Sequence, residues 1–325
     1  RVSEATPIGS RIHSQGCDKG WPPGTVLRIK DQIAVVVMIH WQHYPVVDIL
    51  GFVTANPQTA RGALWAAIAG ASQLDTLILG PTGSGKERIA HIVHTARCIA
   101  HGKGPFVSIN TGALPTTLFA SELFGFERGA FTGADRAVPG AFRSADGGVL
   151  FLDEIGEADE SAQVALLRAV ENREIRPVGA RNNYTVNLTI VAATNRPISG
   201  RKNSIREDLL YRLSGAVVTL PPLKDRKEDI LPLACQFLAT NNCAPTISPE
   251  TIATFNQRPW NGNVRELQRV LRRVSVLSGG AQIHPEILRA ALQSPGTSQF
   301  EPPSTMDPLE SEILRIGELP TSERQ

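Results

Sequence analysis

The sequence predicts an α/β fold, in which helices cover a mostly parallel β-sheet and a small all-helical subdomain follows. Three observations indicate this. A short apolar run, Leu77–Leu79, leads through a glycine-rich loop into a helix. Later apolar runs alternate with helical patterns and end in polar residues, as at Asp153-Glu154. After Pro221-Pro222 only helical patterns remain. Ligands of such parallel sheets bind beyond the carboxyl ends of the strands.

The composition is that of an ordinary globular protein. The chain has 325 residues, with 42% hydrophobic and 20% charged residues and a formal net charge of +2. The total charge therefore does not indicate a nucleic-acid or membrane partner. Four scattered cysteines lack metal-ligand spacing, so we expect free thiols in a reducing cytoplasm. The longest apolar run, Ile33–Ile39, is far too short to cross a bilayer.

The glycine-rich loop has the pattern of a phosphate-binding loop. It reads Gly80-Pro81-Thr82-Gly83-Ser84-Gly85-Lys86-Glu87 and opens a helix with apolar residues spaced by three and four. Glycines let successive backbone N–H groups surround an anion, and the helix N-terminus adds partial positive charge. Lys86 can then reach the β- and γ-phosphates of a nucleotide. An ordinary turn before a helix is the alternative, but the acidic strand downstream argues against it.

Polar residues end three of the predicted strands. The run 149–152 ends in Asp153 and Glu154, the pair that ATP hydrolysis requires downstream of a P-loop. Asp153 is placed to hold Mg²⁺ through water, and Glu154 to polarise the attacking water. Asn110 ends the strand 106–110, and Asn195 follows the strand 188–193. We expect these side chains to meet at one edge of the sheet.

The remaining elements are assigned in chain order. β-branched residues within 25–39 predict two short strands around Lys30-Asp31, either a bare β-hairpin or a segment similar to the end of a forkhead-associated domain. A helix over 58–71 precedes the P-loop strand, and another covers 163–171. Later helices are predicted to begin at Asp225, Ser248, Asn263 and Pro285. The expected units are an extension (1–48), an α/β core (49–222), a helical lid (223–293) and a disordered tail (294–325).

Two groups of side chains have alternative readings. His91 and His94 lie one helical turn apart, but no further ligand lies near them in sequence, so we predict surface histidines rather than a metal site. Five arginines cluster in the lid: Arg258, Arg265, Arg269, Arg272 and Arg273. A solvated helix face with one functional arginine is favoured over a nucleic-acid surface.

The hexapeptide Gly129-Ala130-Phe131-Thr132-Gly133-Ala134 matches, letter for letter, the loop motif of sigma-54-dependent transcription activators, the bacterial enhancer-binding AAA+ ATPases. Glu87 stands where a general P-loop has Ser or Thr, and it is usual in this family. The resemblance covers about residues 49–292 and implies an AAA+ P-loop NTPase, with a parallel sheet sandwiched by helices and a helical lid. Further matches in the family's order are Asn110, residues 145–154, 193–196, 206–213 and 260–267.

The resemblance implies an ATPase that uses ATP and Mg²⁺. Its nucleotide-binding residues would be Gly80, Pro81, Thr82, Gly83, Ser84, Gly85, Lys86, Glu87, Ile49, Leu50, Thr194, Asn195 and Arg265. Its catalytic residues would be Asp153, which serves the metal, Glu154, Asn110, Arg206 and Arg212. Asn110 would restrain or release Glu154, and the two arginines would act on the neighbouring subunit's site, which implies a ring, usually a hexamer. The loop Gly129–Ala134 would push on the sigma-54 subunit of RNA polymerase.

The sequence also departs from the family pattern. Ile205 replaces a common Phe, Thr111-Gly112 replace Cys-Ala, and Asn261 replaces Pro. No helix-turn-helix pattern follows residue 292, so DNA binding by this chain is not implied. The leading interpretation is an ATPase of the bacterial cytoplasm that remodels sigma-54 holoenzyme to allow open-complex formation, without a membrane partner. The alternatives are a generic AAA+ remodeller of another protein and a nucleotide-binding scaffold that does not hydrolyse ATP.

Overall fold

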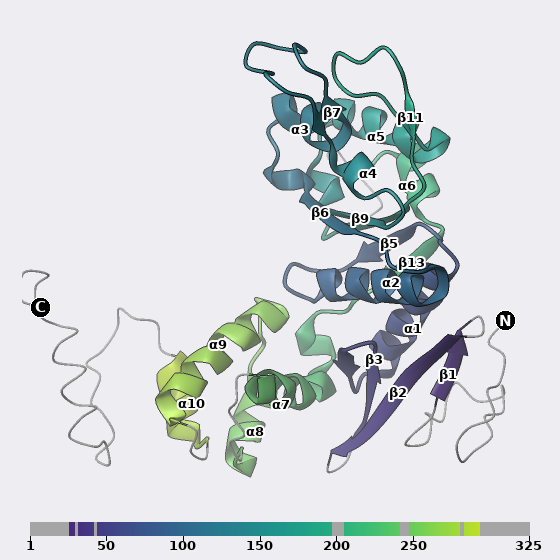
Figure 1. Cartoon of the computed structure of the whole chain (residues 1–325). Helices are drawn as coiled ribbons and strands as arrows, with labels where there is room; N and C mark the ends of the chain where they lie inside the picture. Colours follow the sequence, from purple (N-terminus) through teal and green to yellow (C-terminus); the bar gives the residue numbers. More distant parts are fainter. Residues whose placement is uncertain are drawn as a thin grey trace, which may run out of the picture.

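A computed structural model describes residues 26–29, 32–41, 44–196, 205–240, 247–279 and 283–292. Figure 1 shows the α/β core in the upper part of the view. Below it, the helical lid lies on one side and the N-terminal β-sheet on the other. The predicted disordered tail (294–325) lies outside the described residues. Cys98 and Cys235 are free thiols, and the other two cysteines lie outside the described part.

The core contains a five-stranded sheet in the order β13-β5-β12-β9-β6, with every neighbouring pair parallel. The predicted α/β architecture is therefore confirmed. The edge strand β13 was not predicted, although its alternating burial pattern is typical of a strand. The strands are β5 (Thr76–Leu79), β6 (Phe106–Asn110), β9 (Val149–Asp153), β12 (Thr189–Thr194) and β13 (Ala216–Thr219).

Helices cover both faces of this sheet. Successive strand residues point to opposite faces, so Ile78 packs into one hydrophobic cluster and Leu77 into the other. The first cluster lies under α1 (Pro57–Ala71) and α2 (Lys86–His101). The second lies under α3 (Thr116–Phe124), α4 (Ala141–Ser144), α5 (Glu160–Asn172) and α6 (Glu207–Leu213).

The N-terminal strands form an antiparallel sheet in the order β1-β2-β3-β4. The predicted hairpin around residues 30 and 31 is present, because Ile29 pairs with Gln32. The predicted unit boundary at residue 48 differs from the structure, since it falls inside β3. The sheet continues into β4 because Leu50 and Gly51 form a tight turn between Ile49 and Phe52. The strands are β1 (Val26–Ile29), β2 (Gln32–Trp41), β3 (Tyr44–Ile49) and β4 (Phe52–Thr54).

A linker of two 3-10 turns, η3 (Leu223–Asp225) and η4 (Lys227–Asp229), joins β13 to the lid. The predicted helix start at Asp225 is wrong, because Arg226 has φ −137° and interrupts helical geometry. Ser248 caps its helix as predicted, with its side chain accepting from the Thr251 N–H. The lid helices are α7 (Ile230–Thr240), α8 (Pro249–Gln257), α9 (Asn263–Ser278) and α10 (Pro285–Leu292).

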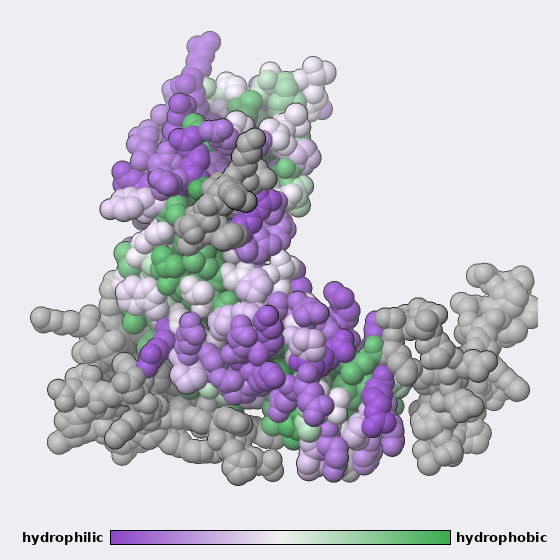
Figure 2. Space-filling view, turned by 180° about the vertical axis from the view of Figure 1, so that it is seen from behind, coloured by the Kyte–Doolittle hydropathy of each residue, from purple (hydrophilic) through white to green (hydrophobic). Residues whose placement is uncertain are grey.

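Two long loops project from the free end of the core, opposite the lid (Figure 1). The first connects β7 (Gly125–Phe126) to β8 (Val138–Pro139), and the second connects β10 (Glu174–Ile175) to β11 (Tyr184–Thr185). Seen from behind, this free end carries a hydrophobic patch beside a hydrophilic projection (Figure 2). Within the described residues, no helix is both long and apolar enough to cross a membrane.

Candidate active site

The P-loop is held between β5 and α2. Gly83 and Gly85 have φ values of +77° and +106°, which residues with a side chain rarely adopt. No side chain caps α2, so the first N–H groups of this helix remain available to an anion. Lys86 is buried, and its Nζ donates to the carbonyls of Gly80 at 3.1 Å and Pro81 at 3.4 Å. Burial lowers the pKa of Lys86, and the charges of Asp153 and Glu154 oppose that shift.

The predicted acidic pair ends β9. Glu154 has φ +57°, an uncommon conformation for a residue with a side chain and one that is typical of functional sites. Its N–H donates to Asp153 Oδ1 at 3.0 Å, and the Thr111 hydroxyl donates to the Asp153 carbonyl at 2.8 Å. The Glu154 N–H thus holds the Asp153 carboxylate, and the αL conformation of Glu154 sets the direction in which its side chain leaves the strand end.

Asn110 stands beside Asp153 in the register of β6 and β9. Its side-chain oxygen accepts from the Ala113 N–H at 3.2 Å and caps the 3-10 turn η1 (Thr111–Ala113). Glu154 lies against this turn, because a Cβ added at Gly112 would come 3.1 Å from Glu154 Oε2. Asn110 and Glu154 thus approach the same turn, and the control of Glu154 by Asn110 stays a prediction.

β12 brings a polar tip to the P-loop. Asn195 Nδ2 donates to Thr82 Oγ1 at 3.0 Å. Thr194 is buried instead, and its hydroxyl accepts from the Arg196 N–H at 3.1 Å. The structure therefore places Asn195 at the P-loop and turns Thr194 toward the backbone.

A cavity of about 290 Å³, the phosphate cavity, brings together six of the thirteen predicted nucleotide-binding residues and the acidic pair Asp153 and Glu154. Arg265 reaches it from the lid, so both subdomains contribute to its wall. Its lining includes the predicted residues Thr82, Gly83, Gly85, Lys86, Glu87, Asp153, Glu154 and Arg265, together with Arg88, His91, Val264 and Gln268. His91 is exposed, as predicted for a surface histidine, and stacks on Phe106 with ring centroids 4.3 Å apart.

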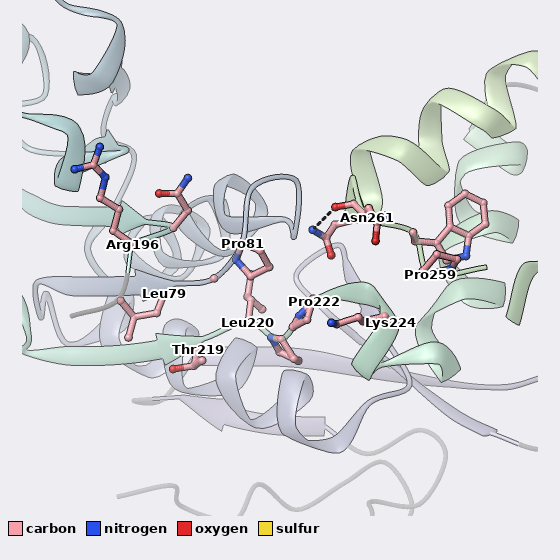
Figure 3. Close-up of a pocket in the computed structure, with 14 residues that line it drawn as sticks. Leu79, Pro81, Arg196, Thr219, Leu220, Pro222, Lys224, Pro259 and Asn261 are labelled. Atoms are coloured by element: carbon pink, nitrogen blue, oxygen red, sulfur yellow. Dashed lines mark hydrogen bonds between the residues drawn. The ribbon is translucent and has the colours of Figure 1, made fainter. Parts of the chain in front are cut away.

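A larger cavity of about 720 Å³ borders the start of the P-loop. Gly80, Pro81 and Asn195 contribute from the core, whereas the opposite wall comes from the linker and the lid. Figure 3 shows Pro81 facing Asn261 across this space, with Lys224 of the linker below Asn261 in this view and Arg196 pointing away from the lid. The P-loop therefore contacts both cavities in the cleft between core and lid.

Two predicted nucleotide-binding residues lie elsewhere. Ile49 is 1% exposed and packs into the core cluster beneath α1 and α2, so it offers almost no surface to a nucleotide. Leu50 is half-buried at the tight turn, with φ +52°, and packs against the same cluster. The prediction for Ile49 is therefore corrected to a core position, because β3 directs its side chain inward.

Arg206 is the half-buried N-cap of α6 and Arg212 is exposed near the end of that helix, and neither lines the phosphate cavity. Arg206 forms ion pairs with Glu160 at 3.2 Å and Asp208 at 2.8 Å. Arg212 Nε donates to Glu171 Oε1 at 3.1 Å. Both guanidinium groups are thus presented to solvent, held by carboxylates of α5 and α6.

A backbone hydrogen bond closes the base of the hexapeptide loop, and the residues at its tip are exposed. The Gly129 N–H donates to the Ala134 carbonyl at 2.9 Å, and Ala134 is buried. Phe131 is 47% exposed, and its ring packs against Phe126 with centroids 4.9 Å apart. Thr132 is exposed beside it. An aromatic ring that is half exposed on a loop tip is typical of a partner contact.

Comparison with protein families decides the assignment. A model of the sigma-54 interaction domain matches residues 53–219, just over half of the chain. A model of the AAA+ ATPase lid domain matches residues 224–305. The chain belongs to the sigma-54 interaction domain family. The predicted resemblance is thereby confirmed, and the boundary predicted at 222 lies between the two matched ranges.

The individual relatives of this sigma-54 interaction domain chain carry different names. The DNA-binding transcriptional regulator NtrC of Escherichia coli is 38% identical over 273 residues, which cover 80% of this chain and 57% of NtrC. A limonene hydroxylase of Geobacillus stearothermophilus is 43% identical over 246 residues, 73% of this chain and 44% of that protein. The crystal structure of NtrX from Brucella abortus in complex with ATP is similar, with a TM-score of 0.64, 25% identity and coverage of 84% and 59%. The chain spans about half the length of the curated relatives it matches.

In this sigma-54 interaction domain, a second loop (176–183) packs against the loop that contains Gly129–Ala134. The sequence analysis did not predict this contact. Val178 bonds to Gly125 and Glu127 through backbone groups at 2.8 and 3.0 Å. A Cβ added at Gly179 would come within 2.9 Å of Ala130 Cβ, so only glycine allows this close approach. The Pro-Val-Gly turn pattern was the available signal, but sequence alone could not show what the turn touches.

Asn263 begins α9, as predicted, and Gly262 is the N-cap of this helix. The contact of the Asn263 side chain with the P-loop was not predicted. Asn263 is buried with φ +54°, and its Nδ2 donates to the Thr82 carbonyl of the P-loop at 2.9 Å. Glu266 makes the capping contact instead, because its Oε2 accepts from the Gly262 N–H at 2.8 Å. The αL conformation directs the Asn263 side chain out of the helix and into the core–lid junction.

The lid arginines differ in position: Arg265 reaches the cavity, whereas Arg258 and Arg273 make contacts within the lid. Arg265 lines the phosphate cavity. Arg258 pairs with Glu266 at 2.6 Å and lies over the ring of Trp260. Arg273 donates to the Ala291 carbonyl at 3.2 Å and joins α9 to α10. This arrangement fits a solvated helix face better than a continuous nucleic-acid surface.

Proposed function

We propose that this chain is an ATPase of the bacterial cytoplasm that remodels sigma-54 RNA polymerase holoenzyme and so allows open complexes to form. The observation that carries the proposal is a combination within one α/β core. A cavity lined by Lys86, Asp153 and Glu154 lies at the lid side, and an exposed loop with Phe131 at its tip lies at the other end. Membership of the sigma-54 interaction domain family and similarity to the transcriptional regulator NtrC support it.

The chemistry assigned to the cavity is attack of water on the γ-phosphate of ATP. Lys86 and the N–H groups at the start of α2 bind the phosphates and offset their charge. Glu154 accepts hydrogen bonds from the attacking water and orients it, while Asn195 senses the γ-phosphate from the tip of β12. Arg265 contacts the phosphates from the lid. NtrX was solved with ATP, which supports ATP as the nucleotide of this fold.

Mg²⁺ is proposed as the metal of this site. Asp153, Glu87 and Glu154 line the same cavity, and carboxylate oxygens suit this ion. Among the described residues no group of three His, Cys, Asp or Glu side chains could hold a metal alone. This fits an ion bound by one or two carboxylates together with substrate phosphates and water. When bound, Mg²⁺ neutralises charge that develops on the phosphates, and Asp153 would hold it through water.

The arginines of α6 are proposed to complete a neighbouring copy's site. Arg206 is half-buried and Arg212 exposed, and neither lines this chain's own phosphate cavity, so a second copy is the simplest source of a receiving phosphate. Supply of fingers in trans implies a closed ring of copies, with a hexamer as the expected size. In the monomer Glu160, Asp208 and Glu171 hold these guanidinium groups until phosphate charge competes for them.

The loop Gly129–Ala134 is assigned to the sigma-54 contact. Phe131 offers an apolar ring and Thr132 a hydroxyl at the open tip, whereas the Gly129–Ala134 hydrogen bond fixes the base. The loop 176–183 touches the first loop through Gly179, so a shift of either loop displaces the other.

A transcription assay tests the proposal. Purified chain, sigma-54 holoenzyme and a sigma-54 promoter fragment are combined with ATP, and heparin-resistant open complexes are counted. We expect open complexes with ATP and none without it. Thr132→Ala should retain ATP hydrolysis and lose open-complex formation. Thr117→Ala, a matched change at an exposed position of α3, should retain both.

Two results would count against this function. If the wild-type chain hydrolyses no ATP at concentrations that form rings, the proposed ATPase activity is refuted. Full open-complex formation by Thr132→Ala would show that this loop does not contact sigma-54.

A further inference from the structure

Three consecutive P-loop carbonyls accept hydrogen bonds from outside the P-loop, and all three donors belong to the linker or the lid. Asn263 Nδ2 donates to the first carbonyl and the Val264 N–H to the second, each at 2.9 Å. The Arg226 guanidinium donates to the third. In order, the acceptors are the carbonyl oxygens of Thr82, Gly83 and Ser84.

These contacts decide where the loop's N–H groups point. A peptide unit is planar and trans, so its C=O and the next residue's N–H point in opposite directions. Holding the carbonyls of 82–84 toward the lid therefore aims the N–H groups of Gly83 and Gly85 the other way, while the Ser84 N–H donates to the Pro81 carbonyl at 3.2 Å. Successive N–H groups aimed at one point form the anion-binding concavity of a P-loop. The lid side thus sets the geometry of the phosphate site.

Arg226 is held by a buried network of its own. It is 1% exposed, and its NH1 lies 3.4 Å from Asp229 Oδ2. Asp229 is 0% exposed and accepts from the Thr54 hydroxyl at 2.8 Å and from the N–H groups of Ala55 and Asn56 at 2.6 and 2.9 Å. Removing one member of a buried ion pair leaves an uncompensated charge. The pair therefore joins the P-loop to the β4–α1 junction as well as to the linker.

Asn263 connects the linker to the P-loop in the same manner. Its Oδ1 accepts from the Leu223 N–H at 2.8 Å while its Nδ2 donates to Thr82. Both functional groups of one buried amide are thus used between two segments far apart in sequence. A lid that rotates away from the core must break the bond to Thr82, while the bond to Leu223 can persist because Leu223 packs in the lid's own hydrophobic cluster.

We propose that Arg226, Asp229 and Asn263 are positioning residues that direct the P-loop N–H groups toward bound phosphate only while the lid is seated, so that nucleotide affinity and lid orientation are coupled. The inference rests on the proposed ATPase function. Coupling between two sites is reciprocal, so bound nucleotide must favour the seated lid by the same factor. The Asp229 contacts with residues 54–56 give the N-terminal sheet a route to the same loop.

Two variants test the coupling and leave a polar side chain of similar size at each buried position. Asn263→Asp keeps the acceptor for the Leu223 N–H and replaces the donor to the Thr82 carbonyl with an oxygen. Arg226→Lys keeps the charge, but an ammonium cannot span Ser84 and Asp229 as the guanidinium does. Asn256→Asp on α8 and Arg258→Lys are the matched lid controls. For each protein we measure the dissociation constant of a fluorescent ATP analogue, kcat and KM, and the midpoint of thermal unfolding.

Lid orientation is measured by energy transfer between dyes on the core and the lid. Lys103→Cys and Arg289→Cys, both at exposed positions, carry the dyes in a chain whose native cysteines are replaced by serine. We expect ATP analogue binding to change the transfer in wild type and in both controls. In Asn263→Asp and Arg226→Lys the change should be lost, and affinity should fall about tenfold, as for a lost hydrogen bond to a charged site.

The outcomes separate the inference from the function on which it rests. A wild-type chain that binds no ATP analogue refutes the ATPase proposal. Wild-type binding, with both variants matching it in affinity and in the energy-transfer response, overturns the coupling alone. Loss of thermal stability with a preserved response also overturns it, because the residues then serve only the fold. If Arg226→Lys does not fold, Asn263→Asp still decides the question.

Discussion

Asn195 Nδ2 lies 3.0 Å from Thr82 Oγ1, and this hydrogen bond joins the tip of β12 to the P-loop. It forms because β12 and β5 pair in parallel, with Thr194 opposite Leu79, so both chains leave the sheet at the same height. Asp153 reaches the same edge at the end of the neighbouring strand β9. The phosphate loop, the acidic pair and the polar sensor are therefore neighbours by sheet register alone.

Lys86→Ala and Glu154→Gln should separate ATP binding from hydrolysis. Lys86 offsets phosphate charge before the reaction, so its loss should abolish binding of a fluorescent ATP analogue. Glu154 acts on water during the reaction, so Glu154→Gln should bind normally while kcat falls about 10²–10⁴-fold. Lys103→Ala and Glu122→Gln, at exposed positions, are the controls. Normal turnover in Glu154→Gln would show that another group orients the water.

Mixed rings should recover activity that each parent lacks. Arg212→Ala subunits contribute an intact phosphate site, and Lys86→Ala subunits contribute intact arginines, so some interfaces in the mixture combine both. An arginine finger is worth about 10³–10⁵ in rate, so restored phosphate release should be readily measured. Mixing Lys86→Ala with Glu154→Gln is the control, because no interface then has an intact site. Mixed rings as inactive as either parent would exclude action in trans.

Gly70→Ala should destabilise the core, although alanine normally favours a helix. A Cβ at position 70 would come 2.2 Å from the Val93 carbonyl oxygen, where α1 crosses α2. Backbone cannot move aside easily, so we expect a loss of about 1–3 kcal/mol in the free energy of unfolding by urea. Gly62→Ala, in the same helix, would meet a side-chain carbon of Val218 at 3.1 Å, and its cost should be smaller. Equal stability of the two variants would contradict the close helix contact.

Asp75 should give the core a measurable pH dependence. Burial raises the pKa of Asp75, while the neighbouring charge of Arg173 opposes that shift. The folded protein thus binds this proton more tightly than the unfolded chain. The stabilisation it contributes is complete below aspartate's ordinary pKa of about 4 and is lost as pH rises through the raised value. Relative to Asp75→Asn, wild type should therefore gain stability as pH falls from about 7 to 4.

Thermal unfolding midpoints of both proteins across that range measure the effect. Asp225→Asn, at an exposed position of the linker, is the control and should follow wild type. A difference between wild type and Asp75→Asn that does not change with pH would show that Asp75 titrates alike in both states.

The sequence by itself determined the elements whose signal is local. The strand–loop–helix at Gly80–Glu87 depends on glycine conformation and apolar spacing within one short segment, and the Asp153-Glu154 strand end is equally local. The parallel sheet followed from alternation of strands and helices, which places strand ends at one edge. The exposed loop at Phe131 followed from a hexapeptide that the fold does not require.

Tertiary structure decided what these segments touch. Asp225 had the pattern of a helix start, but the contacts of Arg226 with Ser84 and Asp229 hold the linker in two 3-10 turns. Asn263 had the pattern of a helix cap, yet its αL conformation sends the amide to the P-loop. Ile49 could have faced a nucleotide, and β3 turned it into the core. These outcomes depend on packing between residues far apart in sequence, which periodicity and turn propensity do not encode.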